Sequence, residues 1–163
     1  MKETSNIFSN APALPGPSIQ RQLGQADLTF KELVHALPVA IYTCDSEGFI
    51  DFFNPAAMAL WGRKPEIGKD KWHSFWNYCH ADGSAMPLDE CPVAITLKSG
   101  QIFSAKESKI KKNDHPCSKL LVSPCPIFNE HHHIIGVHNT VVDVTMQKQD
   151  EEKKAMLSAL VES

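Results

Sequence analysis

Strand-forming and helix-forming patterns follow one another along this chain in an order that restricts its fold. Three strand-length runs occupy the last third, at 102–112, 119–128 and 133–144, and only short polar connections separate them. Short helical patterns precede these runs, and a pair of shorter strand-like runs precedes the helices. No internal repeat or low-complexity tract interrupts the order. The sequence therefore predicts a single α+β domain.

The N-terminal part divides into an arm and a helix. Residues 1–26 carry prolines and glycines among polar residues without periodic apolar spacing, which predicts a flexible arm. Residues 27–38 have apolar side chains at helical spacing, with Asp27 as a capping residue and Pro38 as a stop. We expect an amphipathic helix whose apolar stripe consists of Phe30, Leu33, Val34 and Leu37.

A β-hairpin and a helix are predicted next. The runs 40–44 and 49–53 are rich in β-forming residues, and an acidic turn ending in glycine joins them. Asn54 and Pro55 follow directly. Asparagine is a preferred N-cap and proline suits the first helical position, so we expect a helix over 56–61.

The centre of the chain is predicted to be helical in short pieces. The segment 69–80 is rich in aromatic residues and is expected to form short helices, whereas Asp89 should cap a longer helix that closes at Gly100. The predicted core therefore spans 39–145. Beyond it, residues 146–163 are first charged and then apolar at helical spacing, which predicts a C-terminal helix of coiled-coil type.

Composition and charge exclude several functional classes. The 163 residues are 42% hydrophobic and 21% charged, which fits one globular domain with short extensions. A net charge of −3 argues against a nucleic-acid partner, because nucleic-acid-binding surfaces carry a basic excess. No apolar run is long enough to cross a bilayer, and the first ten residues lack the pattern of a secretory signal. We expect a cytoplasmic protein without a membrane partner.

Several short motifs occur in a characteristic order and spacing. They are Ala40-Ile41-Tyr42 followed by Asp45-Ser46-Glu47-Gly48, Phe52-Phe53-Asn54-Pro55-Ala56-Ala57, Leu60-Trp61-Gly62, Asp82-Gly83 with Pro87, Asp89-Glu90-Cys91-Pro92-Val93-Ala94, and Val142-Asp143-Val144-Thr145. Together they resemble the PAS (sensory box) domains of bacterial two-component sensor proteins, over residues 29 to 150. The resemblance implies a five-stranded antiparallel sheet, with short helices over one face and flanking N- and C-terminal helices.

The resemblance also implies a function in signal transduction. It predicts a non-catalytic input module, of a histidine kinase or a similar receptor, that couples ligand occupancy or partner contact to the geometry of its terminal helices. The apolar stripes of those helices favour a homodimer, with a downstream signalling domain as a further partner. An N-terminal input domain of a longer receptor and a complete small adaptor both remain open.

A ligand pocket is expected between the inner sheet face and the short helices. Period-two alternation places Val137, Asn139 and Val141 on one face, and Ile50 and Phe52 together on one face of the second strand. A mostly apolar cavity with one amide would suit a small organic ligand. The alternative is a filled core, because cores use the same residue types. The candidate pocket residues are Ile50, Phe52, Trp72, Trp76, Cys91, Ile95, Asn139 and Val141.

The known cofactors of such domains do not match the residues present. A flavin adduct needs a cysteine between asparagine and arginine, whereas Cys91 lies between Glu90 and Pro92. A haem needs an axial histidine on the helix beside the pocket, and residues 90–97 contain none. We therefore predict no obligatory cofactor.

Three polar residues are candidates for a signalling junction. Asn54 lies between a predicted strand and helix, and Asp143 and Thr145 lie where the last strand meets the C-terminal helix. Their side chains can bond local backbone and so fix the direction in which that helix leaves. The alternative is that all three serve only as helix caps.

The second functional class considered is a metal- or thiol-dependent enzyme or a redox sensor. Cys91 lies in the predicted first turn of a helix, where the macrodipole can lower the pKa of a thiol, although Glu90 opposes this and a packed thiol is the simpler interpretation. Cys79 and His80 with Cys91, or the run His131-His132-His133, contain metal-ligand types without a familiar zinc spacing. No phosphate-binding loop, nucleophile elbow or zinc-protease motif occurs, so we predict neither a metal site nor enzymatic activity.

Overall fold

The computed structural model describes residues 32–113 and 115–162. The predicted arm and the first residues of the helix predicted over 27–38 lie outside these ranges. Residues 32–36 are helical, and the Leu37 amide donates to the Leu33 carbonyl in the last turn. Val34 is buried, whereas Leu33 and Leu37 are exposed. Within the described part, this helix thus presents one apolar residue to the core.

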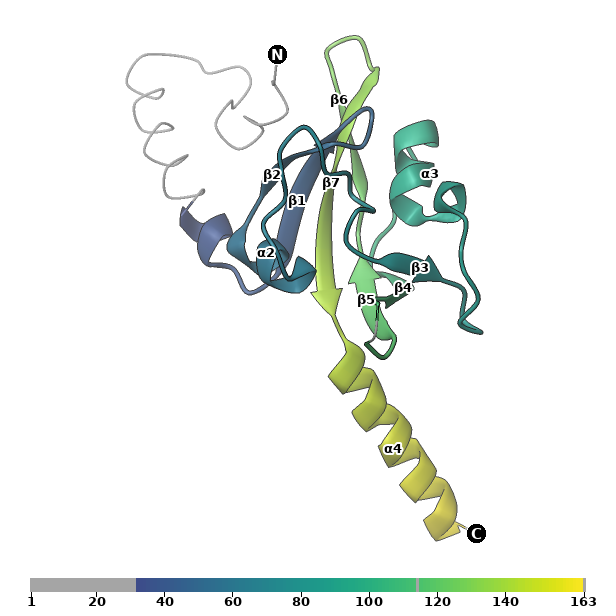
Figure 1. The fold of residues 1–163 in the computed structure, drawn as a ribbon. Helices are drawn as coiled ribbons and strands as arrows, with labels where there is room; N and C mark the ends of the chain where they lie inside the picture. Colours follow the sequence, from purple (N-terminus) through teal and green to yellow (C-terminus); the bar gives the residue numbers. More distant parts are fainter. Residues whose placement is uncertain (1–31, 114, 163) are drawn as a thin grey trace, which may run out of the picture.

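One antiparallel sheet forms the centre of the molecule (Figure 1). The strand order is β2-β1-β7-β5-β4-β3, and β6 pairs with the other end of β7. The prediction of an α+β fold around an antiparallel sheet is confirmed. The strands are β1 (Ala40–Asp45), β2 (Ile50–Phe53), β3 (Asn77–Cys79), β4 (Lys106–Lys111), β5 (Ser118–Val122), β6 (Cys125–Phe128) and β7 (Ile134–Asp143).

The described strands outnumber the five expected for two reasons. The run predicted over 119–128 is interrupted at Ser123 and Pro124, so it forms β5 and β6, which pair with successive parts of β7. Pro124, which has no amide to donate to a strand ladder, lies at this break. The other addition is β3, at the edge of the sheet.

The segment 69–80, predicted to be helical, forms an isolated bridge, a turn and a short strand. Its first part lies along the hairpin, where the Ile50 amide donates to the Asp70 carbonyl and the Trp72 amide to the Gly48 carbonyl. Its last part forms β3, which pairs with β4. The helical prediction was wrong because the segment bonds to the hairpin and to β4, and its aromatic side chains pack in or against the core.

The described helices begin and end at residues with special backbone preferences. Helix α2 (Pro55–Trp61) has Asn54 as its N-cap and a left-handed Gly62 after its end, as predicted. Asp89 does not cap a long helix, because a short 3₁₀ helix, η2 (Leu88–Glu90), precedes α3. Cys91 is the extended N-cap residue of α3 (Pro92–Ser99), since a residue before proline avoids helical geometry. Helix α4 (Thr145–Glu162) completes the chain.

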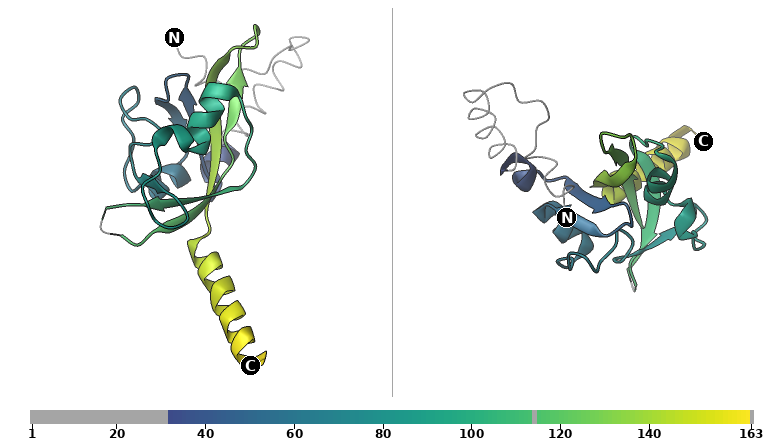
Figure 2. Two further views of the ribbon diagram at one scale, coloured as in Figure 1. Left: turned by 90° about the vertical axis from the view of Figure 1, so that its right-hand side faces the viewer. Right: turned by 90° about the horizontal axis from the view of Figure 1, so that it is seen from above.

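The hydrophobic core lies between the sheet and the segments that contain α2 and α3. It includes Trp61 of α2, Val93 of α3 and side chains from one face of β1, β4, β5 and β7. Helix α4 is separate from this core: it projects from the end of β7 and buries none of its residues (Figures 1 and 2). No helix in the described ranges is both long enough and apolar enough to cross a membrane.

A β-bulge in β2 changes which of its side chains face the core. Phe53 pairs with Tyr42 and Ile50 with Cys44, so the strand has one extra residue, Asp51, between these pairs. Ile50 and Phe53 therefore share the core face, whereas Phe52, opposite Thr43, lies on the other face. The prediction that Ile50 and Phe52 share a face was wrong for this reason.

Candidate functional site

Most of the candidate pocket residues lie within the packed core. Phe52 lies on the opposite sheet face, and Ile95 on α3 is half-buried. Trp72 packs edge-on against Tyr78, with ring centroids 5.7 Å apart. The remaining members belong to one cluster of buried side chains or lie beside it: Ile50, Trp72, Trp76, Cys91, Asn139 and Val141.

The amide of Asn139 bonds other core groups. Its Nδ2 donates to the Tyr42 hydroxyl at 3.0 Å, and its Oδ1 accepts from the Ser123 amide at 3.0 Å. Both Asn139 and Tyr42 are buried, and burial raises the pKa of Tyr42 well above its usual value. These bonds join β1, β7 and the break between β5 and β6. The amide that was expected to contact a ligand therefore forms hydrogen bonds with polar groups of the core.

A cleft with a volume of about 690 Å³ opens beside this core, between α3 and the β3–β4 end of the sheet. Ile95 is the one candidate pocket residue that lines it. The β-strand register places Lys106 and Ser108 on the core face of β4, and Glu107 and Lys109 on the other face. Strand β3 ends opposite Lys109, so the cleft extends around the edge of β4 beyond that point. The other lining residues include Tyr78, His80, Met86, Glu90, Gln101, Phe103 and Lys119.

A signal for this cleft is present in the sequence of β4, although it is not among the motifs that predicted the fold. The core-facing positions 106 and 108 are Lys and Ser, whereas the next one, Ile110, is apolar and buried. Polar residues at core-facing strand positions indicate that the core does not continue there. The cleft lies where this alternation fails.

Cys91 is a packed thiol. It is fully buried, and its Sγ lies 3.7 Å from the Pro87 carbonyl oxygen. Burial, with the carboxylates of Asp89 and Glu90, raises the pKa of Cys91 to about 12. Its position before α3 therefore does not yield a reactive thiolate, because desolvation and two negative charges outweigh the helix dipole.

The histidines do not join other ligand types into a metal site. Among the described residues, no group of three or more histidines, cysteines or acidic residues is placed to hold a metal ion. His80 instead lies at the cleft, with Nε2 3.6 Å from a Glu90 carboxylate oxygen. His131 and His133 lie in the exposed turn before β7, with ring centroids 6.4 Å apart.

Asn54 connects four segments of the chain. Its Oδ1 accepts from the Ala57 amide, as a helix cap does, and also from the Ile41 amide of β1, both at 3.0 Å. Its Nδ2 donates to the carbonyls of Val34 and Val39 at 2.9 and 2.8 Å. The predicted cap is confirmed, and the side chain also holds the N-terminal helix to the hairpin.

The junction between β7 and α4 is tied to β5. The Asp143 carboxylate accepts from the Thr145 amide and hydroxyl at 2.9 and 2.6 Å. The Lys119 amide donates to the Thr145 hydroxyl at 2.9 Å, and the Val144 amide donates to the Lys119 carbonyl at 2.9 Å. The start of α4 is therefore fixed to a neighbouring strand.

Two ion pairs continue this attachment along the first turns of α4. Lys119 Nζ lies 2.8 Å from a Glu152 carboxylate oxygen, and Lys148 Nζ lies 3.7 Å from a Glu107 carboxylate oxygen. The first pair raises the pKa of Lys119 and lowers that of Glu152. Lys119 and Glu107 also line the cleft. Two side chains of the sheet thus line the cleft and also form ion pairs with α4.

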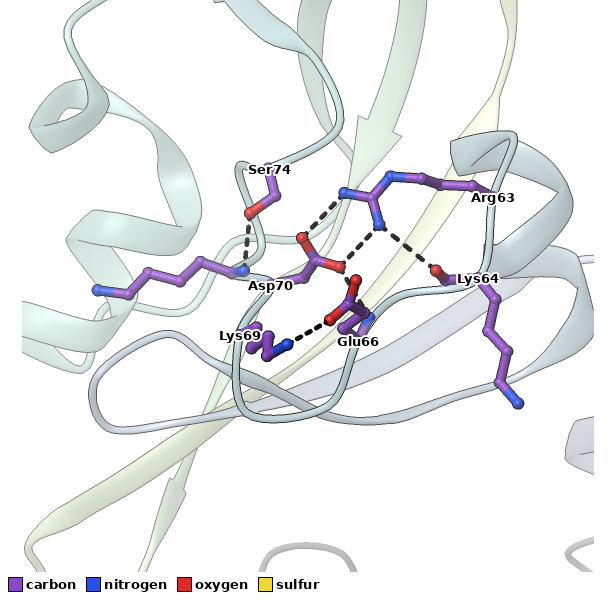
Figure 3. A network of polar contacts seen from close by, with 7 residues as sticks. Arg63, Lys64, Glu66, Lys69, Asp70 and Ser74 are labelled. Atoms are coloured by element: carbon purple, nitrogen blue, oxygen red, sulfur yellow. Dashed lines mark hydrogen bonds and ion pairs between the residues drawn. The ribbon is translucent and has the colours of Figure 1, made fainter.

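A second polar network holds the loop after α2 (Figure 3). The Arg63 guanidinium donates to both Asp70 carboxylate oxygens, at 2.7 and 2.9 Å, and the Glu66 amide donates to Asp70 at 2.7 Å. The hydrogen bond from Arg63 lowers the pKa of Asp70 to about 2. Arg63 also lies over the ring of Phe75, which stacks on Trp61 at 4.5 Å. This network fixes the segment between α2 and β3 against the core.

Comparison with known proteins identifies the class of fold. No protein-family model and no curated protein matches the chain. Among solved structures, an RNA-binding light-oxygen-voltage receptor superposes with a TM-score of 0.62 at 17% identity. That match covers 94% of this chain and 41% of the receptor chain, so the chain spans less than half of that receptor's length.

Two further structures are of similar length to this chain. A sensory box histidine kinase/response regulator from Burkholderia thailandensis has a TM-score of 0.54 and 14% identity, covering 82% of this chain and 97% of that one. The PAS domain of Bordetella pertussis BvgS has a TM-score of 0.52 and 13% identity, covering 83% and 98%. These matches show the class of fold, an α+β domain built on one antiparallel sheet. In particular, the chain has the PAS fold that its motifs predicted.

Proposed function

We propose that this chain is a non-catalytic sensory module, which converts ligand occupancy or partner contact into a changed geometry of its terminal helices. The observation that supports this proposal most directly is the way in which α4 is attached at the end of β7. There, Thr145 and Asp143 tie the start of α4 to Lys119 of β5, while no residue of α4 is buried. A helix that is held at one end by a few polar contacts can change direction at modest energetic cost.

The proposed output is an altered contact between two copies of α4. Its C-terminal turns carry four exposed apolar side chains, which recur at positions 156, 157, 160 and 161. Such a stripe is stabilised when a second helix covers it. We propose a homodimer that presents paired α4 helices to a downstream signalling domain, as in the input part of a histidine kinase or a similar receptor.

We also propose a cytoplasmic location. The five cysteines are all within the described ranges and none forms a disulfide. Reduced thiols are the usual state of cysteine in the cytosol. The net charge of −3 favours small molecules and proteins over nucleic acids as partners.

A kinase chimera tests the transducing role. In a fusion of this chain, through α4, to the catalytic part of an unrelated histidine kinase, Thr145→Val should change autophosphorylation on the order of two- to tenfold. The substitution removes the hydroxyl contacts with Lys119 and Asp143. Thr140→Val, the same change on β7 where no side-chain hydrogen bond is seen in the described ranges, is the matched control. Equal rates for both variants and the parent would contradict the proposal.

A further inference from the structure

We infer that the cleft between α3 and β4 binds a small organic anion, a carboxylate on an apolar body, with Lys106 as its anchoring cation. This inference rests on the proposed sensory function, and it places the ligand outside the packed core. The cleft volume of about 690 Å³ lies within the range of pockets that hold small organic molecules.

The apolar part of such a ligand has a matching surface. Ile95 of α3, Met86 and Phe103 line the cleft, together with Tyr78 of β3. Met86 and Tyr78 also contact or belong to the hydrophobic core, so this wall is fixed by packing. Burying an apolar group against it removes apolar surface of both partners from water.

The charged side chains of the cleft indicate the sign of the charge that a ligand would carry. Most of its charged side chains already have partners, whereas the exposed ammonium group of Lys106 forms no ion pair or hydrogen bond with any described residue. The register places Lys106 opposite the buried Val122, on the face that carries the apolar lining. An anion is the complement of a cation without a partner beside an apolar wall. The partnered groups are Lys119 with Glu152, Glu107 with Lys148, His80 with Glu90, and Lys109 with the Ala81 carbonyl.

Lys119 links this site to α4. It lines the cleft and holds Glu152 of α4 at 2.8 Å. The register places Lys119 opposite Lys109, on the other face of the sheet from Lys106, so a carboxylate that reaches around the edge of β4 competes with Glu152 for the Lys119 ammonium group. Because linkage is reciprocal, a ligand that draws Lys119 away loosens α4, and loss of the Glu152 contact strengthens ligand binding.

Amide NMR of the full chain, titrated with 4-phenylbutanoate, tests the ligand class. The matched probe is 4-phenylbutanamide, which has the same apolar body without the charge. We expect saturable shifts of the amides of Ile95, Phe103 and Lys106 with the carboxylate, and at least roughly threefold weaker binding of the amide. Equal affinity for the two probes, or no carboxylate shifts at the cleft, overturns the inference.

Two lysine variants test the anchoring role. Lys106→Gln should weaken carboxylate binding roughly three- to tenfold and leave amide binding unchanged, because it removes a charge-assisted contact. Lys111→Gln makes the same change on the same strand, outside the cleft, and should have no effect. An equal loss of carboxylate affinity in both variants would mean that Lys106 acts only through the net charge of the protein, and it would overturn the assignment.

Glu152→Gln tests the exchange at Lys119. It should tighten carboxylate binding by roughly twofold or more, whereas Asp150→Asn, which removes an equal charge from α4, should not. Equal affinities in the two variants overturn the exchange. The kinase chimera is an independent test. If Thr145→Val changes autophosphorylation but no carboxylate binds, this inference is rejected and the proposed function is retained. If a carboxylate binds but Thr145→Val leaves autophosphorylation unchanged, the ligand site is retained and the proposed transducing role is rejected.

Discussion

At the scale of single residues, the buried side chains of Asn54 and Asn139 each join segments that are distant in the sequence. Asn54 was identified as a helix cap from the Asn-Pro pair that follows a strand. Its bonds to Ile41, Val34 and Val39 were not predicted, because they join segments whose approach is set by the tertiary fold. Asn139 was similarly placed on the core face, but its pairing with Tyr42 depends on the strand order.

Replacing Asn54 should be among the more destabilising polar substitutions in the domain. Asn54→Ala removes four hydrogen bonds and leaves buried backbone groups without partners, so we expect a loss of about 2–4 kcal/mol in unfolding free energy. Urea denaturation measures it. Asn77→Ala, an exposed asparagine on β3, is the control. Similar losses in the two variants would show that the bonds to Asn54 contribute little.

Asp70 should make stability depend on pH in the acid range. Its pKa in the folded protein is about 2, below the ordinary 3.8, mainly because Arg63 donates to its carboxylate. A lowered pKa stabilises the fold above the unfolded value, and this contribution is lost as pH falls toward the folded value. Asp70→Asn should therefore show a smaller difference in unfolding free energy between about pH 5 and pH 2.5 than the parent.

Urea denaturation at the two pH values provides that comparison. Asp150→Asn, on the exposed surface of α4, is the control for removing one carboxylate. A pH dependence that is the same in the parent, the Asp70 variant and the control would mean that the Arg63 contact is not maintained in solution.

At the scale of elements, the sequence predicted the hairpin, α2, the three C-terminal strand runs and α4. These have strong local signals: alternation, the Asn-Pro start and the Gly62 end. The conformation of the segment before β3 was missed because it depends on pairing with residues 48–50, which lie in a different part of the sequence. The reversal of Phe52 was missed because a bulge leaves no clear mark in a four-residue strand.

The candidate site was predicted less well than the fold. Alternation correctly placed Asn139 and Val141 toward the core, but core and pocket linings use the same residue types. The cleft instead depends on where β3 ends and where Lys106 interrupts the apolar face of β4. Local patterns do not specify how far a neighbouring strand extends.

The apolar stripe of α4 should control association. Replacing both Leu160 and Val161 with lysine introduces charge into the proposed contact between two α4 helices, so the dimer should dissociate at protein concentrations where the parent remains paired. Light scattering during gel filtration measures the molar mass. Replacement of Asp150 and Gln149 with lysine provides a control on the same helix. An unchanged mass for the Leu160 and Val161 variant would exclude this contact.

At the scale of the whole molecule, α4 lies outside the hydrophobic core. All the buried hydrophobic residues in the described ranges lie before α4. Removal of residues 146–163 should therefore lower the melting temperature by no more than a few degrees, because only exposed ion pairs are lost. Calorimetry at low protein concentration measures this. Loss of cooperative unfolding would show that α4 is part of the folding unit.

The position of β7 determines how mechanical load passes through the domain. This strand has neighbours on both sides, β1 along one edge and β5 and β6 along the other, and α4 continues directly from it. Tension along α4 would therefore load several ladders in shear, so their hydrogen bonds would have to yield together and not one by one. A twisting force on α4 would instead act on the polar contacts at the β7–α4 junction, because the ladders on both sides of β7 resist rotation of the strand itself.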